Sequence, residues 1–157
     1  MPELITHTIF AYLIRRRKWT IHFIIIFLFG AMLPDLVSRP FIVIFENFQY
    51  FFATFHTPIA LILICYLISL LFADEIMKKV FLILLFGVLT HLFLDLFQIN
   101  IKSQGYGWLF PFSNFDFQIG LFWAEDSILV LHWTIAIFLI DFLFEKRIIK
   151  LFSKNKE

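Results

Sequence analysis

Long apolar runs alternate with short polar stretches along most of the chain. Four of these runs, at residues 19–36, 56–73, 80–97 and 128–144, come close to the roughly 20 residues that a helix needs to cross the hydrocarbon core of a bilayer. Residues 3–14 form a further apolar segment of about half that length. The pattern therefore predicts membrane-spanning and half-spanning helices.

Two stretches break this pattern. We expect Pro34 and Asp35 to end the first long helix, because proline removes a backbone donor. Residues 37–55 are rich in phenylalanine but include Glu46, which is typical of an interfacial or re-entrant piece. Residues 98–127 contain turn-forming glycine, proline and asparagine. A connection that long in a small protein is usually functional.

The composition places the chain in the membrane class. Of its 157 residues, 61% are hydrophobic and only 16% are charged, with a mean hydropathy of +0.89, whereas soluble domains carry about 25% charged residues. The net charge of +1 gives no reason to expect a nucleic-acid partner, and the single cysteine, Cys65, excludes an internal disulfide. We therefore predict one all-α domain over residues 1–157. It should be an integral membrane bundle of about four spanning or half-spanning helices plus a re-entrant or interfacial segment.

Basic residues cluster at the ends of the apolar runs. The clusters are residues 15–18, Lys78 with Lys79, and residues 146–154. A path that goes back and forth across the bilayer places all three on one side, which the positive-inside rule assigns to the cytoplasm. We expect a multi-pass protein of a bacterial or archaeal inner membrane.

His91 and Asp95 stand four residues apart near the end of an apolar run. On a helix this spacing puts both side chains on one face. At a rise of about 1.5 Å per residue, His7, Asp35 and His56 also fall in the half of the bilayer away from the basic clusters. Two carboxylates and three imidazoles suit a divalent metal, with zinc the expected ion. The alternative is a hydrogen-bonded packing contact between spans.

Several short motifs follow one another along the chain: THTIF, LPD, FHT, HLFLD and GYGWLFPFS. Their order and spacing resemble the membrane-bound metal-dependent hydrolase family (YdjM-like). The ligand pattern is also similar to that of zinc-dependent phospholipase C and S1/P1 nuclease. The resemblance implies on the order of one to three metal ions, a phosphoester or lipid-like substrate, and these metal ligands: His7, Asp35, His56, His91, Asp95 and Asp126. It also implies loop residues that shape the mouth of the site: Trp108, Pro111, Phe112 and Ser113.

One departure from the family pattern concerns the substrate. Phe51 and Phe52 stand where the family usually has a His-Arg pair. An arginine there could hold an anionic group of the substrate, and Arg39, which closely follows Asp35, could supply that charge instead.

We expect metal-dependent hydrolysis of a phosphoester in a membrane lipid or lipid-linked molecule. The metal would activate water, and Asp35, Asp95 and Glu46 are the candidate catalytic carboxylates. Two alternatives remain open: a structural metal or polar network without catalysis, and a metal or proton transporter. Transport is disfavoured because polar residues thin out toward the cytoplasm, where only His22 and Asp141 are candidates.

Overall fold

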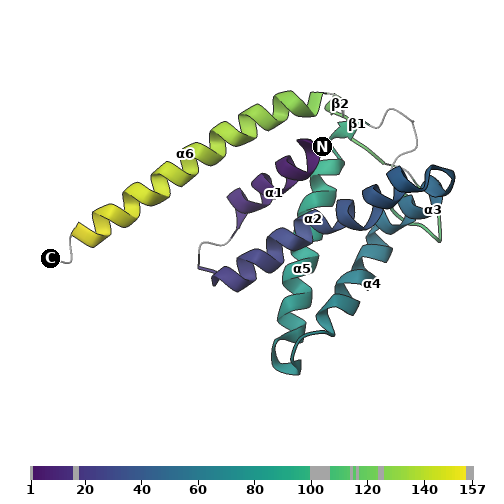
Figure 1. Cartoon of the computed structure of the whole chain (residues 1–157), viewed down its shortest axis with the longest axis horizontal. Helices are drawn as coiled ribbons and strands as arrows, with labels where there is room; N and C mark the ends of the chain where they lie inside the picture. The colour runs from purple at the N-terminus through teal and green to yellow at the C-terminus, as the bar shows by residue number, and fades with distance from the viewer. Residues whose placement is uncertain are drawn as a thin grey trace.

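The computed structural model describes residues 2–15, 18–99, 107–113, 115, 117–123 and 126–154. The main helices are α1 (Pro2–Ile14), α2 (Ile21–Ile44), α4 (Pro58–Ser69), α5 (Asp74–Asp95) and α6 (Ser127–Lys154). The shorter elements are η1 (Glu46–Phe48), α3 (Gln49–Ala53), η2 (Thr54–His56), β1 (Gln98–Ile99) and β2 (Phe122–Trp123). The described chain is therefore mostly helical (Figure 1), as predicted, with one short parallel strand pair added.

The helices α2 and α5 form the centre of the fold and approach each other at two glycines. A Cβ on Gly30 would overlap the Leu84 carbonyl oxygen, and a Cβ on Gly87 would lie 2.7 Å from the backbone nitrogen of Ala31. Only glycine permits so close an approach of two backbones, which is a common way for membrane helices to pack tightly.

These two helices run in the same direction. Near their starts, Lys79 Nζ lies 4.4 Å from the centroid of the Phe23 ring. Further along both helices, His91 Nδ1 lies 2.7 Å from the carbonyl oxygen of Ala31. The basic start of α5 therefore lies beside the start of α2, as the predicted path requires.

The helices α1 and α4 pack against this central pair. Ala11 of α1 is buried in an apolar cluster with Ile83 of α5. On α4, Leu61 and Cys65 belong to a second apolar cluster with Leu84 of α5. Helix α6 lies along α1 and extends beyond the other helices (Figure 1). The core is thus made by four helices, with α6 attached through α1.

Helix α2 continues through Pro34 and Asp35 to Ile44, so the prediction that it ends at Pro34 is wrong. Membrane helices tolerate an internal proline where neighbouring helices and side chains satisfy the affected backbone groups. Here Pro34 is buried among neighbouring helices and the helix continues through it. The consequence is that Asp35 projects from within a helix instead of from a loop.

Two other helix boundaries differ from the predicted ones. Helix α5 begins at Asp74 and not at Val80, because Asp74 and Glu75 suit the positive end of a helix dipole. Helix α6 runs from Ser127 to Lys154. The basic tail therefore continues the last apolar run as a single helix.

Two of the described helices, α2 and α5, are long and apolar enough to cross a membrane. Residues 46–56 and α4 meet at a bend of 74°, and together they would make a third span or a re-entrant loop. The apolar parts of α1 and α6, Leu4–Ile14 and Leu129–Phe144, are shorter. Membrane-spanning helices are thus supported, whereas the described residues do not establish a bundle of four spans.

Candidate metal centre

Five polar side chains from different parts of the chain meet where α1, α2 and α5 come together. His7 comes from α1, Asp35 from α2, His56 from the end of η2, and His91 and Asp95 from α5. Their exposed fractions are 5%, 3%, 6%, 1% and 0% in that order. We refer to these residues as the five-residue cluster.

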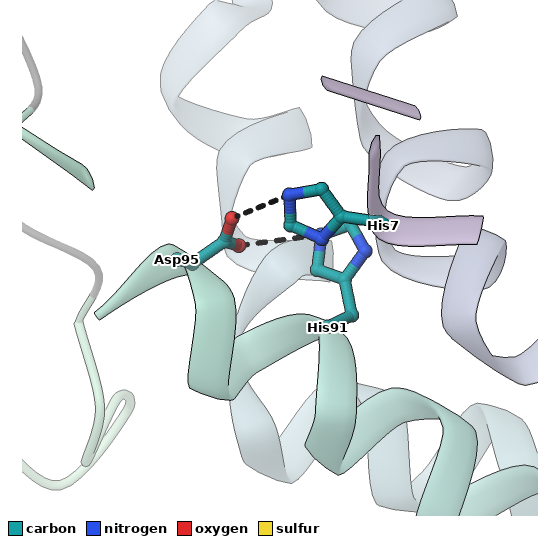
Figure 2. A group of neighbouring side chains, drawn as sticks. All are labelled: His7, His91 and Asp95. Atoms are coloured by element: carbon teal, nitrogen blue, oxygen red, sulfur yellow. Dashed lines mark ion pairs between the residues drawn. The ribbon is translucent and has the colours of Figure 1, made fainter. Parts of the chain in front are cut away.

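Asp95 lies at the centre of the five-residue cluster. Its Oδ1 is 3.5 Å from His7 Nε2. Its Oδ2 is 2.8 Å from His56 Nε2 and 3.2 Å from His91 Nε2. Figure 2 shows the His7 and His91 rings one over the other, with the Asp95 carboxylate facing both; the ring centroids are 3.9 Å apart. Asp35 joins through its Oδ1, which is 3.7 Å from His91 Nε2.

The backbone of α2 determines which nitrogen of His91 carries a proton. His91 Nδ1 is 2.7 Å from the carbonyl oxygen of Ala31. A carbonyl oxygen only accepts hydrogen bonds, so Nδ1 is the donor. In the neutral ring, Nε2 then has a lone pair, and Nε2 is the atom that faces Asp35 and Asp95.

Ser38 imposes the same arrangement on His56. The Ser38 hydroxyl donates its only hydrogen to the carbonyl oxygen of Pro34 at 2.7 Å. Its oxygen therefore accepts from His56 Nδ1, which lies 3.2 Å away. The lone pair of a neutral His56 is then on Nε2, directed at Asp95 Oδ2.

This arrangement requires additional positive charge. Nitrogen lone pairs and carboxylate oxygens repel one another unless a proton or a cation lies between them. Asp35 pairs with Arg39, whose Nε is 2.6 Å from Asp35 Oδ1, but Asp95 leaves a second carboxylate charge in the same buried space. Burying an uncompensated charge is very unfavourable. Either protonated imidazoles or a bound cation must supply the missing charge.

The donor atoms fit a metal ion. Within the described residues, the buried atoms without a hydrogen-bond partner include His7 Nδ1, His91 Nε2, Asp95 Oδ1 and both carboxylate oxygens of Asp35. Oδ1 of Asp35 has the Arg39 guanidinium nearby, in a geometry that makes an ion pair but not an aligned hydrogen bond. Ligands at about 2.1 Å from a tetrahedral zinc lie about 3.4 Å apart. The nitrogen–oxygen separations of 3.2, 3.5 and 3.7 Å are close to that value, whereas the 2.8 Å between His56 Nε2 and Asp95 Oδ2 is the distance of a hydrogen bond.

Two groups of three residues offer ligand atoms that lie within 4.8 Å of one another. The first is His7, His91 and Asp95, and the second is Asp35, His56 and His91. These buried histidine and aspartate groups could hold a metal ion. Both groups need His91 Nε2, and one nitrogen lone pair binds one ion, so we infer that the two groups would compete for a single ion.

Glu46 and Asp126 lie outside the five-residue cluster. Glu46 is exposed at the start of η1, and Asp126 is exposed just before α6. A surface pocket of about 300 Å³ is lined by residues 43–48, and none of the five clustered residues lines it. Neither acidic residue joins the two groups that could hold a metal. The geometry thus gives no support to their predicted roles as catalytic residue and ligand.

The loop residues expected at the mouth of the site divide into two kinds. Trp108 is partly buried against the apolar cluster that contains Leu92, and its Nε1 donates to the carbonyl oxygen of Phe117 at 2.7 Å. The other loop residues, Pro111, Phe112 and Ser113, are exposed. Trp108 therefore anchors this loop on the apolar core formed by α2, α4 and α5.

Phe51 and Phe52 lie on the short helix α3. The Phe52 ring is 5.2 Å from that of Phe41 on α2 and 5.7 Å from that of Phe45, the residue that follows α2. Phe51 is exposed. The position where a His-Arg pair was expected is thus occupied by aromatic packing against the end of α2.

Ser38 and the Ala31 carbonyl are functional groups that the sequence did not reveal as such. Ser38 follows Asp35 by three residues and therefore shares its helix face. A serine on that face of an otherwise apolar helix is a weak signal that could have suggested a role. The Ala31 carbonyl gives no signal, because every residue carries one.

Comparison with known protein families agrees with a membrane-helical architecture. A model of the family described as YdjM inner membrane protein matches residues 4–154. The chain belongs to the YdjM family. Searches for similar curated proteins and for similar solved structures each gave no match. The YdjM match covers all five clustered residues and supports the predicted inner-membrane location. The resemblance to zinc-dependent phospholipase C and S1/P1 nuclease stays a prediction.

Proposed function

We propose that this YdjM protein is a membrane-embedded, metal-dependent hydrolase that cleaves a phosphoester in a membrane lipid or lipid-linked molecule. One observation carries the proposal: hydrogen bonds from His91 Nδ1 and His56 Nδ1 direct two imidazole lone pairs at the buried Asp95 carboxylate. That arrangement suits a divalent cation, for which zinc is the best candidate, since its usual ligands are histidine and carboxylate.

The residues of the cluster would have different roles in this reaction. His7, His91 and Asp95 would hold the ion, because they are the group of three that contains the central carboxylate, and His56 Nε2 lies beside it at 2.8 Å from Asp95 Oδ2. When bound, a divalent cation makes water a nucleophile near neutral pH and offsets charge on phosphate oxygens. Asp35 would accept the proton of the attacking water at Oδ2, since its Oδ1 faces Arg39.

The depth of the site favours a lipid substrate. The cluster lies between α2 and α5, the two helices able to cross a membrane, and at the end of α5 away from its basic start. The positive-inside rule then directs the site toward the non-cytoplasmic side of a multi-pass protein. A lipid headgroup would reach this depth from the bilayer itself.

The first experiment measures metal content. We expect the purified protein to contain zinc or another divalent metal at about one ion per chain, and the Asp95→Ala variant to lose most of it. The substitution removes a ligand together with the negative charge that offsets the charge of the ion. Elemental analysis of both proteins gives the readout, with Asp74→Ala, an exposed carboxylate at the start of α5, as the control.

Hydrolysis is tested on the same preparations. We expect release of phosphate or a phosphorylated headgroup from mixed phospholipid vesicles by the parent protein and not by Asp95→Ala. Equal metal content in the two proteins would refute the site. Metal in the parent without hydrolysis of any phospholipid class would refute the enzymatic proposal.

A structural metal site is the second candidate function, and burial favours it. No member of the five-residue cluster is more than 6% exposed, and structural metal sites are closed whereas catalytic sites keep an open position. The two candidates differ in whether a small ligand such as phosphate changes the spectrum of cobalt(II) bound in place of zinc.

Transport has less support. Next to the cluster, an apolar group of buried residues lies along α1, α2 and α5: Ala11, Phe27, Ala31 and Ile83. The buried Thr90 on α5 donates its hydroxyl to the Gly87 carbonyl of the same helix. His22 is exposed, and Asp141 lies 3.8 Å from Arg15. Within the described residues, these side chains do not continue a polar path from the cluster toward the basic end.

A further inference from the structure

Residues 117–123, beside the end of α5, show an inverted pattern of exposure. Four alternate side chains of this segment are exposed and apolar, and so is Phe115 before them. Between them, Gln118 and Gly120 are only half-buried or better covered, although Gln118 is polar. A segment that faces water has its polar side chains outside and its apolar ones inside. We call the five exposed residues the outward row: Phe115, Phe117, Ile119, Leu121 and Trp123.

Backbone hydrogen bonds fix the outward row on the end of α5. The Ile119 nitrogen donates to the Leu96 carbonyl oxygen at 2.7 Å. The Leu121 nitrogen donates to the Phe97 carbonyl oxygen, also at 2.7 Å. Strand β2 then pairs with β1, which follows α5 in the chain (Figure 1). The row therefore has a set position relative to a helix that is long and apolar enough to cross a membrane.

Helix α5 carries an exposed apolar stripe that leads to the outward row. Four of its exposed residues recur at the spacing of one helix face: Leu82, Phe86, Leu89 and Phe93. The Phe93 ring lies 5.0 Å from the ring of Phe97, and Phe97 is the residue that accepts the hydrogen bond from Leu121. The apolar face of a membrane-crossing helix faces lipid, so the stripe and the row form one apolar surface with the same environment.

We propose that the outward row lies in the bilayer, at the boundary between headgroups and acyl chains, in the leaflet at the Asp95 end of α5. Large exposed apolar patches mark contacts with proteins or membranes, and continuity with the stripe on α5 favours lipid over a second copy of the chain. The depth follows from the backbone, because lipid-exposed irregular backbone does not occur within the hydrocarbon core. Trp123 also suits the interface, where tryptophan is enriched.

The chemistry of the segment indicates which lipids it accepts. Residues 117–123 contain no lysine, arginine, aspartate or glutamate, so insertion depends on apolar area and not on anionic headgroups. Neither this inference nor its test depends on a metal or on hydrolysis. It bears on the site in one respect: with the outward row in the leaflet, the end of α5 that carries Asp95 lies at the depth of the headgroups.

Spin labels at single cysteines measure the depth. Leu121→Cys and Phe117→Cys are labelled with a nitroxide in phosphatidylcholine proteoliposomes. EPR power saturation then compares accessibility to molecular oxygen, which concentrates in lipid, with accessibility to a water-soluble nickel chelate. The references are Leu89→Cys on the stripe of α5 and Asp74→Cys, which is exposed at the start of that helix. Cys65 is buried, so the parent protein treated with the same label gives the background.

We expect the ratio of oxygen to nickel accessibility at both row positions to be several-fold higher than at Asp74→Cys and to approach that at Leu89→Cys. Replacing part of the phosphatidylcholine by phosphatidylglycerol should leave the ratio unchanged, because the segment carries no charge. All four substituted side chains are exposed, so the labels do not disturb the core.

Four results would overturn the inference. A ratio like that of Asp74→Cys at either row position puts the row in water. Low accessibility to both reagents together with dipolar broadening between labels identifies a second copy of the chain as the partner. Low accessibility without broadening means that another part of the same chain covers the row. A high ratio that requires phosphatidylglycerol means that charged residues outside the row hold the segment at the membrane.

Discussion

The same two helices make the tightest apolar contact and the most polar one in the described molecule. At the glycine crossing, Gly30 and Gly87 bring the backbones of α2 and α5 together without intervening side chains. One turn further along, the same helices present His91 and Asp95 to Asp35. The first contact depends on shape and the second on charge.

The difference shows that the polar cluster depends on the apolar crossing. His91 Nδ1 can reach the Ala31 carbonyl because the two backbones are in contact nearby. The contact is made by Gly30, which precedes Ala31, and by Gly87, one turn before His91. Three predictions concern the glycine crossing, the polar cluster and, outside both, the contact between α6 and α1, in order of expected effect.

The largest effect is expected at the glycine crossing. In Gly87→Ala the new methyl would lie 2.7 Å from the Ala31 nitrogen and overlap the Phe27 carbonyl, so the helices must separate. We expect a loss of about 3 kcal/mol or more in the free energy of unfolding, despite the gain of about 1 kcal/mol in helix propensity. The loss in free energy of unfolding is measured by unfolding the protein in detergent with increasing SDS.

The control for that variant is Leu89→Ala, which changes an exposed side chain on the same helix. The free energy of unfolding of this variant should be much closer to that of the parent protein. Metal affinity should fall in Gly87→Ala as well, since the His91–Ala31 hydrogen bond would be stretched. A variant that keeps the parent's stability would show that the crossing is not constrained by backbone contact.

An intermediate effect is expected at Ser38. Replacing it by alanine removes the acceptor for His56 Nδ1, so the His56 ring can rotate or change tautomer. We expect metal affinity to fall by about 10-fold to 100-fold, measured by competition with a zinc chelator. Ser69→Ala is the matched control, because Ser69 is equally buried but donates to the Tyr66 carbonyl on α4. Equal affinities in the two variants would remove Ser38 from the metal centre.

The smallest effect is expected where α6 meets α1. Arg15 Nη1 is 3.8 Å from Asp141 Oδ2, and Asp141 is partly exposed. Partly exposed ion pairs of this kind contribute about 1 kcal/mol or less. A double-mutant cycle with Arg15→Gln and Asp141→Asn should give a coupling energy in this range. A coupling of several kcal/mol would mean that α6 belongs to the core.

The membrane class and the positions of most helices could be predicted from the sequence, because apolar runs of this length are stable as helices only in a bilayer or a large core. The helix ends were harder to predict. Pro34 ends a helix by local rules, but α2 continues to Ile44, where its packing against α5 holds this stretch in the helix. Such packing comes from partners that lie elsewhere in the sequence.

The candidate site, like the fold, depends partly on local sequence spacing and partly on tertiary contacts. The sequence by itself determined that His91 and Asp95 share a face, since i,i+4 spacing on a helix is a local property. The tertiary structure decided that His7, Asp35 and His56 join them and that Glu46 does not, because that depends on how α1, α2 and η2 meet α5. It also decided that Nε2 of each of His56 and His91 faces the carboxylates. The reason is that the Nδ1 partners, Ser38 and the Ala31 carbonyl, are brought there by the contact between α2 and α5.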